Sequence, residues 1–186
     1  MKTTIVYAHP WSGSFNQSIL SKLVMRYPEA SVIDLYGDQF NPVMSVEELA
    51  LFSKGESLDP LIKDYQLLLQ QTNRLIVVFP IWWYGMPAIL KGFFDKVMLK
   101  EFAYKEGKAG VLVGQLSQVK ETYIVTTSQS PTWYIKYFGG NPIAKTLIKR
   151  VLKDIGLKKV KWINEGTIAT SPKEKKNAFL DRLAKI

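Results

Sequence analysis

Short apolar runs alternate with longer stretches of helical period from one end of the chain to the other. Runs rich in β-branched and aromatic residues occupy positions 3–8, 31–35, 75–79 and 123–127, and a weaker run occupies 161–164. Such runs are typical of strands. The run at 75–79 contains no polar residue, which indicates a strand that is covered on both faces. The pattern therefore predicts five strands.

Helical patterns fill the spaces between these runs. Apolar residues recur at helical spacing in 15–26, and similar segments follow at 58–71, 87–99, 142–155 and 172–184. Proline at the start of three of these segments suits a first helical turn, and Gly156 suits a C-cap. The stretch 37–55 is the least regular, and we expect at most one short helix there, after Ser45.

The alternation of strands and helices predicts an α/β protein. Five β units joined by helices imply a doubly wound, five-stranded parallel sheet with right-handed crossovers and helices on both faces. No internal repeat or linker divides the 186 residues, so we expect one domain that spans 1–186.

The amino-acid composition excludes several kinds of catalytic and metal site. The chain has no cysteine and one histidine, His9, which excludes thiol catalysis and disulfides and argues against a metal site or a Ser-His-Asp triad. No secretory signal or membrane-length apolar run is visible, so a cytoplasmic protein is expected. The net charge of +9 suits anionic small molecules, an anionic membrane surface or nucleic acid. The late lysines recur at helical spacing, however, so we interpret them as solvated faces and expect no nucleic-acid partner.

Ligands of doubly wound sheets bind beyond the carboxyl ends of the strands, which selects three loops: 9–14, 80–86 and 126–134. The first loop starts a helix with Ser12, Gly13 and Ser14, an arrangement that suits a phosphate. The alternative is that Ser14 and Gln17 form only a capping box. The loop matches neither the Walker motif nor G-x-G-x-x-G, so the sequence does not favour ATP or Rossmann-type NAD binding.

The second loop lies in FPIWWYGMP, where three large aromatic residues follow the central strand. Aromatic rings and free backbone N–H groups together suit a flat heterocycle with polar edges, such as a flavin. The alternative is that Trp82, Trp83 and Tyr84 close the end of the sheet or contact a second subunit. The third loop is rich in hydroxyl groups, which could face the flavin edge or could be ordinary turn residues.

Four segments taken in order carry a family resemblance: HPWSGSFNQSI, FPIWWYGMPAILKGFFDKV, EFAY and VTTSQSPTWY. They resemble the flavodoxin-like NAD(P)H:quinone oxidoreductases, a family that includes the DT-diaphorase type, the modulator of drug activity type and the ancillary flavoproteins of potassium efflux. The resemblance implies a flavodoxin-like fold, FMN or alternatively FAD as cofactor, and NADPH or NADH as electron donor. It implies two-electron transfer to quinone-like, nitro or azo acceptors by a homodimer. The alternative function is a flavin-binding regulatory subunit that docks on a membrane transporter.

The resemblance also assigns residues. It implies that the flavin phosphate lies at His9, Ser14, Phe15 and Asn16, and that the isoalloxazine ring is lined by Pro80, Ile81, Trp82, Trp83 and Tyr84. The family's TTGG run corresponds to Thr126, Thr127, Ser128 and Gln129. Tyr134 corresponds to a catalytic tyrosine near flavin O2, and Phe102 and Tyr104 resemble substrate-pocket residues.

Two features depart from the family pattern. Ser128 and Gln129 stand where the family has glycines, so the backbone is expected to approach the flavin less closely. The quinone reductases of this family carry a histidine six residues after the tyrosine, where this chain has Gly140. Proton transfer must therefore use other groups, and Tyr134, water or a nearby lysine are the candidates.

The segment 87–99 bears on the quaternary state. Its apolar residues extend over more than the single stripe that a sheet-packed helix needs. A second copy of the chain would cover the remaining face and set residues around Phe102 and Tyr104 over the flavin. The alternative is that the segment 37–55 folds over this helix within one chain.

Overall fold

The computed structural model describes all 186 residues. Its centre is a sheet in the order β2-β1-β3-β6-β7, and every neighbouring pair of strands is parallel. The strands are β1 (Thr3–Tyr7), β2 (Ser31–Asp34), β3 (Arg74–Pro80), β6 (Glu121–Thr127) and β7 (Val160–Glu165). The predicted α/β fold with five parallel strands is confirmed, including the weakest strand.

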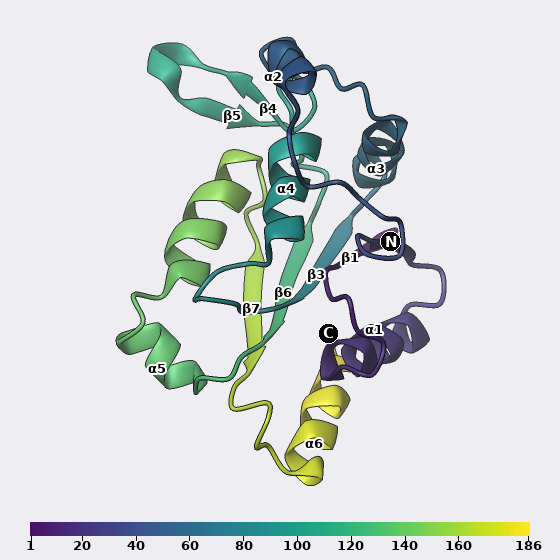
Figure 1. The fold of residues 1–186 in the computed structure, drawn as a ribbon, viewed down its shortest axis with the longest axis vertical. Coiled ribbons are helices and arrows are strands. Elements are labelled where there is room, and N and C mark those ends of the chain that lie inside the picture. Colours follow the sequence, from purple (N-terminus) through teal and green to yellow (C-terminus); the bar gives the residue numbers. More distant parts are fainter.

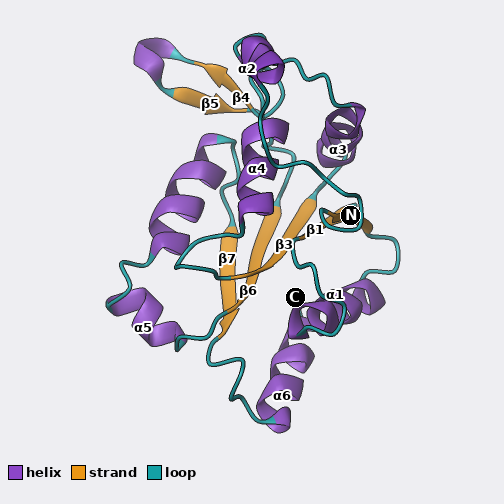
Figure 2. Cartoon of the chain, viewed as in Figure 1, coloured by secondary structure: helices purple, strands orange, loops and turns teal.

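Helices cover both faces of the sheet (Figures 1 and 2). On one face, α1 (Phe15–Arg26) and α6 (Lys173–Leu183) pack on side chains such as Ile5 and Tyr7. On the other face, α3 (Pro60–Gln70), α4 (Ala88–Val97) and the π-helix η2 (Ile143–Leu152) pack on side chains such as Val6 and Ala8. Successive residues of a strand point to opposite faces, so the unbroken apolar strands supply both cores at once.

The carboxyl ends of the strands lie at the lower edge of the sheet in Figure 1, where β7 leads through a loop into α6. The loops after β1, β3 and β6 end at this same edge because the strands are parallel. The short helix α5 (Thr132–Tyr137) also lies there. The three loops predicted to hold the chemistry therefore come together, although the third is shorter than expected because α5 begins at Thr132.

Two further elements lie at the other end of the molecule. The helix α2 (Val46–Phe52) is the short helix expected after Ser45, which caps it. An antiparallel hairpin, β4 (Tyr104–Glu106) and β5 (Leu112–Gly114), projects beside it, with a 3-10 turn η1 (Lys108–Gly110) at its tip. The hairpin was not predicted, because strands of three residues are too short to show a period.

The second apolar face of α4 is covered within the chain. Phe93 lies in the core, with its ring centroid 6.4 Å from that of Phe40. Gly92 allows the chain at Pro42 to lie directly on the helix, since a Cβ at Gly92 would stand 2.4 Å from the Pro42 carbonyl oxygen. The segment 37–55 thus folds over α4, as in the alternative above, and the burial of this helix gives no argument for a dimer.

The helices of the structure are all short or polar. None of them combines the length and the apolar character needed to span a bilayer.

Candidate functional site

The amino end of α1 forms the first part of the candidate site. The Ser14 Oγ accepts a hydrogen bond from Gln17 N at 3.1 Å and caps the helix. Only this half of the predicted capping box forms, because Ser14 N donates to Trp11 O instead. The N–H groups of Phe15 and Asn16 have no acceptor in the chain, and no acidic residue stands in the first turn. Free N–H groups at the positive end of a helix dipole suit an anion.

Asn16 gives independent evidence for a ligand there. Its side chain is buried, and Nδ2 donates to Thr127 Oγ1 at 2.9 Å, but Oδ1 has no partner. Buried polar atoms are nearly always paired. If the amide turns by 180°, Thr127 donates to Oδ1 and Nδ2 is free to donate to a ligand. The arrangement fits a phosphate that accepts from Asn16 and from the start of α1.

A cavity of about 380 Å³ opens at this position, and we call it the α1 cavity. The loop 9–16 forms one wall, Pro80 and Trp82 another, and Thr127 and Gln129 a third. Residues 168, 169 and 176 close it from the side of α6. The predicted phosphate residues His9, Ser14, Phe15 and Asn16 all line this cavity.

His9 lies in the wall as a neutral group. Burial lowers the pKa of its imidazole below the ordinary value. Its Nδ1 accepts a hydrogen bond from Trp11 N at 3.1 Å, which requires that nitrogen to be unprotonated. His9 therefore offers a hydrogen-bonding ring near neutral pH rather than a positive charge.

The aromatic stretch after β3 forms a tight turn. Trp82 N donates to Gly85 O at 3.0 Å and Gly85 N donates to Trp82 O at 2.9 Å. The two residues between them, Trp83 (φ 48°) and Tyr84 (φ 63°), both adopt the left-handed conformation. Such turns normally carry asparagine or glycine at these positions. Two bulky aromatic residues held in a strained backbone indicate a functional site.

The rings of this turn line a second cavity of about 410 Å³, the aromatic cavity. Its wall is formed by Ile81, Trp82, Trp83 and Tyr84 on one side and by residues 128–130 with Ile135 on the other. Trp83 is 98% exposed, and Trp82 and Tyr84 are also exposed, so these rings do not fill the core. Trp82 and Gln129 belong to both cavities, which therefore adjoin.

The strain at Trp83 predicts an unusual stability change. A left-handed residue other than glycine costs roughly 1–2 kcal/mol, and glycine loses about 0.5–1 kcal/mol in backbone entropy. Trp83→Gly should therefore be more stable toward urea than Trp83→Ala by about 0.5–1 kcal/mol, because both variants lose the exposed ring and only glycine relieves the strain. Equal unfolding free energies would show that the turn is not strained.

The loop after β6 supplies polar groups to the aromatic cavity. Gln129 and Ser130 line it, and their N–H groups have no acceptor in the chain. Thr127 O accepts from Ile81 N at 2.7 Å and ties this loop to the aromatic turn. Thr126 and Ser128 are buried beneath it. The structure thus brings the four residues of the TTGG-like run to the site, with backbone donors free in the cavity wall.

Four predicted residues do not line either cavity: Thr126, which is fully buried, and Tyr134, Phe102 and Tyr104. The ring of Tyr134 stacks on Phe138 with centroids 5.9 Å apart, and its neighbour Ile135 lines the aromatic cavity instead. Phe102 and Tyr104 lie beyond the far end of α4, whose ten residues carry the chain about 15 Å away from the aromatic turn. Gly140, at the position of the family histidine, has φ +73°, a conformation that favours glycine.

Lys176 was missed by the sequence reasoning. It comes from α6, lines the α1 cavity and is partly buried, and its ammonium group has no hydrogen bond or ion pair within the chain. The order of strands could have directed attention to residues after the fifth strand, because they reach the same edge of the sheet. Nothing in the sequence distinguishes Lys176 from its neighbours Lys173 and Lys175.

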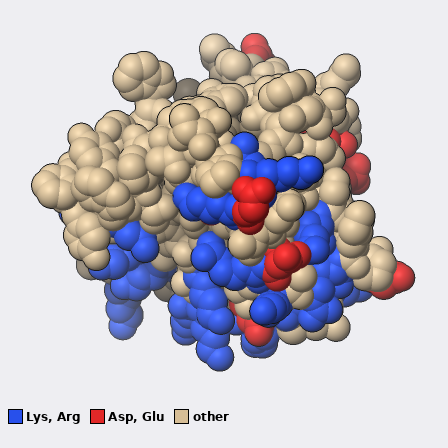
Figure 3. Space-filling view, turned by 90° about the horizontal axis from the view of Figure 1, so that it is seen from below, with Lys and Arg blue, Asp and Glu red and all other residues tan.

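Most of the net positive charge of the molecule comes from the last quarter of the chain. Residues 141–186 carry 12 Lys or Arg and 4 Asp or Glu, which is +8 of the net charge of +9. Seen from below, Lys and Arg gather over the lower part of the view, with few acidic side chains among them (Figure 3). A positive field of this kind attracts anionic ligands such as phosphates and nucleotides.

Comparison with known proteins gives matches over the whole length of the chain. A family model described as a flavodoxin-like fold matches residues 1–186. An uncharacterized NAD(P)H oxidoreductase of Haemophilus influenzae is 29% identical over 189 residues, which cover 99% of this chain and 93% of that protein. The crystal structure of Smu.1420 from Streptococcus mutans is 33% identical, with a TM-score of 0.84, and the match covers 100% of this chain and 97% of that one.

A mammalian relative matches over a shorter length. NAD(P)H dehydrogenase [quinone] 1 of Cavia porcellus is 30% identical over 153 residues, which cover 72% of this chain. The match covers 55% of the relative, so the chain spans about half the length of that protein.

Proposed function

The chain belongs to the flavodoxin-like NAD(P)H:quinone oxidoreductase family, and from this membership we propose that it transfers two electrons from NADH or NADPH to quinone-like, nitro or azo acceptors through a bound flavin. The observation that carries the proposal is the pair of adjoining cavities. One offers aromatic walls with free N–H groups, and the other offers the free amino end of a helix. A flavin nucleotide has a flat ring and a phosphate that match these two environments.

The residues have separate tasks in this proposal. Phe15, Asn16 and Ser14 bind the phosphate at the start of α1, and FMN is the form we propose. Ile81, Trp82, Trp83 and Tyr84 hold the ring from one side, and Gln129 and Ser130 donate backbone N–H groups from the other. Such donors stabilise negative charge that develops in a water-poor site. The flavin supplies the redox chemistry, and the protein supplies binding, orientation and electrostatics.

The proton that accompanies electron transfer needs a protein group or water. His9 is neutral and held by Trp11, and Gly140 has no side chain to offer. Tyr134 does not line the aromatic cavity, but its neighbour Ile135 on α5 does, so we propose that Tyr134 serves this task through water.

Reconstitution tests the proposal directly. The purified chain should bind FMN, and anaerobic addition of NADH or NADPH should bleach the flavin absorbance, which a quinone should then restore. Steady-state turnover on the order of ~10 s⁻¹ is expected. Free FMN under the same conditions is the control. Binding of FMN without bleaching by either nucleotide would contradict the enzyme and favour the regulatory subunit of a transporter.

We further propose that the active unit is a homodimer. Exposed aromatic side chains surround the aromatic cavity: Trp83, Trp133, Tyr137 and Phe138. Contiguous apolar exposure of this kind marks an interaction surface. Phe102 and Tyr104 lie far from their own cavity, so they can serve as substrate-pocket residues only for a second copy.

Sedimentation at micromolar concentration tests the dimer. A species of twice the 21.2 kDa chain mass is expected. Phe138→Glu should shift it toward the monomer, whereas Met25→Glu, an equally exposed apolar position on α1, should not. A monomer in the unmodified chain would remove the proposed roles of Phe102 and Tyr104.

A further inference from the structure

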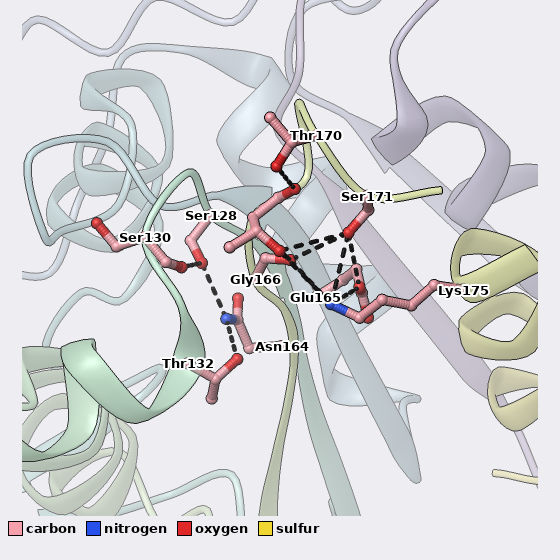
Figure 4. Close-up of polar contacts among 10 residues, drawn as sticks. Ser128, Ser130, Thr132, Asn164, Glu165, Gly166, Thr170, Ser171 and Lys175 are labelled. Atoms are coloured by element: carbon pink, nitrogen blue, oxygen red, sulfur yellow. Dashed lines mark hydrogen bonds and ion pairs between the residues drawn. The ribbon is translucent and has the colours of Figure 1, made fainter. Parts of the chain in front are cut away.

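A polar network underlies the loop that lines the aromatic cavity, and its centre is Asn164 at the end of β7 (Figure 4). The Asn164 Nδ2 donates to Ser128 Oγ at 3.0 Å and to Thr132 Oγ1 at 2.8 Å. The Asn164 Oδ1 accepts from Thr126 Oγ1 at 2.7 Å, and that hydroxyl accepts from Trp162 Nε1 at 2.8 Å. One amide side chain thus contacts three hydroxyl groups on both sides of the cavity loop.

Ser128 is fixed at every polar atom. Its N donates to Glu165 O at 2.9 Å, its O accepts from Ile168 N at 3.0 Å, and its Oγ donates to Ser130 O at 2.7 Å. The Oγ also accepts the bond from Asn164 Nδ2, which occupies one of its two acceptor sites. Ser128 stands where the family resemblance has glycine, so the hydroxyl of this chain adds an attachment point that glycine lacks.

The chain at the end of β7 packs closely against the segment 130–132. A Cβ at Gly166 would stand 2.8 Å from Thr132 N and 3.0 Å from Ser130 O. The absence of a side chain therefore lets the segment 130–132 lie directly on β7. Gln129 and Ser130, by contrast, have no acceptor for their N–H groups within the chain. Gln129 and Ser130 are therefore held in the cavity wall by the residues on either side of them.

We propose that Asn164 is a positioning residue that fixes the segment 128–132 through Ser128 and Thr132, and so holds the free N–H groups of Gln129 and Ser130 at the wall where the flavin ring binds. The part of this inference that concerns flavin binding rests on the proposed function. The attachment of the segment to Asn164 is a property of the chain itself and can be tested without it. Asn164 lines neither the α1 cavity nor the aromatic cavity, so its effect on a ligand there passes through the loop.

The same strand end provides a matched control. Glu165 is buried, and its Oε1 accepts from Ser171 Oγ at 3.3 Å and pairs with Lys175 Nζ at 3.0 Å. This branch fixes the chain between β7 and α6 and makes no side-chain contact with the segment 128–132 (Figure 4). Ser171→Ala removes one hydroxyl from a buried site beside Asn164 and leaves the cavity loop attached.

The first measurement is amide hydrogen exchange in the flavin-free chain. Asn164→Ala should speed exchange at positions 128 and 168 about tenfold, because Ser128 N donates to Glu165 O and Ile168 N donates to Ser128 O, and these bonds open more often once the attachment to Asn164 is lost. The double variant Ser128→Ala with Thr132→Val removes the same contacts from the other side and should have the same effect. Adding Asn164→Ala to it should bring no further increase, since residues in one network do not act additively. Ser171→Ala should leave both rates unchanged.

The second measurement is FMN affinity. Asn164→Ala should raise the Kd for FMN about tenfold, and Ser171→Ala should not. Unchanged exchange at positions 128 and 168 in Asn164→Ala, or an additive triple variant, would overturn the positioning role. A chain that binds no FMN would overturn the proposed function instead, and the exchange rates would still decide the role of Asn164.

Discussion

Replacing Lys176 with methionine is expected to weaken the binding of FMN about 10- to 100-fold, because a hydrogen bond to a charged group contributes roughly 1.5–3 kcal/mol. The affinity for riboflavin, which lacks the phosphate, should remain nearly the same. Isothermal titration of both ligands into the flavin-free chain measures the difference. The comparison isolates the phosphate, since both ligands place the same ring in the aromatic cavity.

Lys176 is singled out by the chemistry of the α1 cavity. Among the residues that line it, Lys176 alone carries a permanent charge. His9 cannot supply one near neutral pH, because burial lowers the pKa of its imidazole. The other donors, such as Phe15 N and Asn16, are neutral. A dianionic phosphate bound there needs a compensating cation, and Lys176 has no other partner to give up.

Lys173→Met is the matched control for this experiment. Lys173 is an exposed residue in the first turn of the same helix and does not line the cavity. Lys173→Met removes the same charge from the molecule as Lys176→Met. A small loss of FMN affinity that both variants share would therefore measure only the long-range electrostatic attraction of the whole protein. Equal losses for FMN and riboflavin in Lys176→Met would show that the phosphate does not lie beside this lysine.

The fold could be predicted because its signals are local and repeated. The unbroken apolar run of β3 shows that both faces of that strand are covered, and prolines and glycines mark several helix ends. The hairpin β4–β5 could not be predicted, since each strand has three residues and its register depends on pairing across a turn. The sequence left the cover of α4 open between a second copy and the segment 37–55, because the choice depends on Pro42 lying against Gly92, 50 positions later in the chain.

The site could be predicted only as far as the loops that the topology brings together. His9, Trp82 and Gln129 lie in the loops selected by the rule that ligands bind at the carboxyl ends of parallel strands. Asn16 was assigned only through the family resemblance. The same rule gives no side-chain direction, and Tyr134 stacks on Phe138 rather than lining the cavity. Asn164 lies on the last strand and Lys176 on the last helix, and only the folded chain brings them to the site.

The cover of α4 leads to the largest expected change in stability. Phe93→Ala should lower the free energy of unfolding by about 3–5 kcal/mol, as is usual when a fully buried large aromatic side chain is removed. The ring of Phe93 lies 6.0 Å from that of Tyr65 and 5.7 Å from that of Phe94, between centroids, and contacts Phe40 across the helix. Urea denaturation of the flavin-free chain measures the loss, and Leu67→Ala, an exposed position on α3, should cost little.

The same substitution in a background that does not dimerise shows which chain covers α4. Phe40 and Tyr65 belong to the same chain as Phe93, so Phe93→Ala should cost the same free energy in the unmodified protein and in the Phe138→Glu background, where the proposed dimer is disrupted. If a second copy covered α4 instead, the cost would shrink once the dimer was lost, because stability would then depend on association. A loss below about 1 kcal/mol in both backgrounds, far under the cost of a buried aromatic, would mean that the segment 37–55 does not pack on α4.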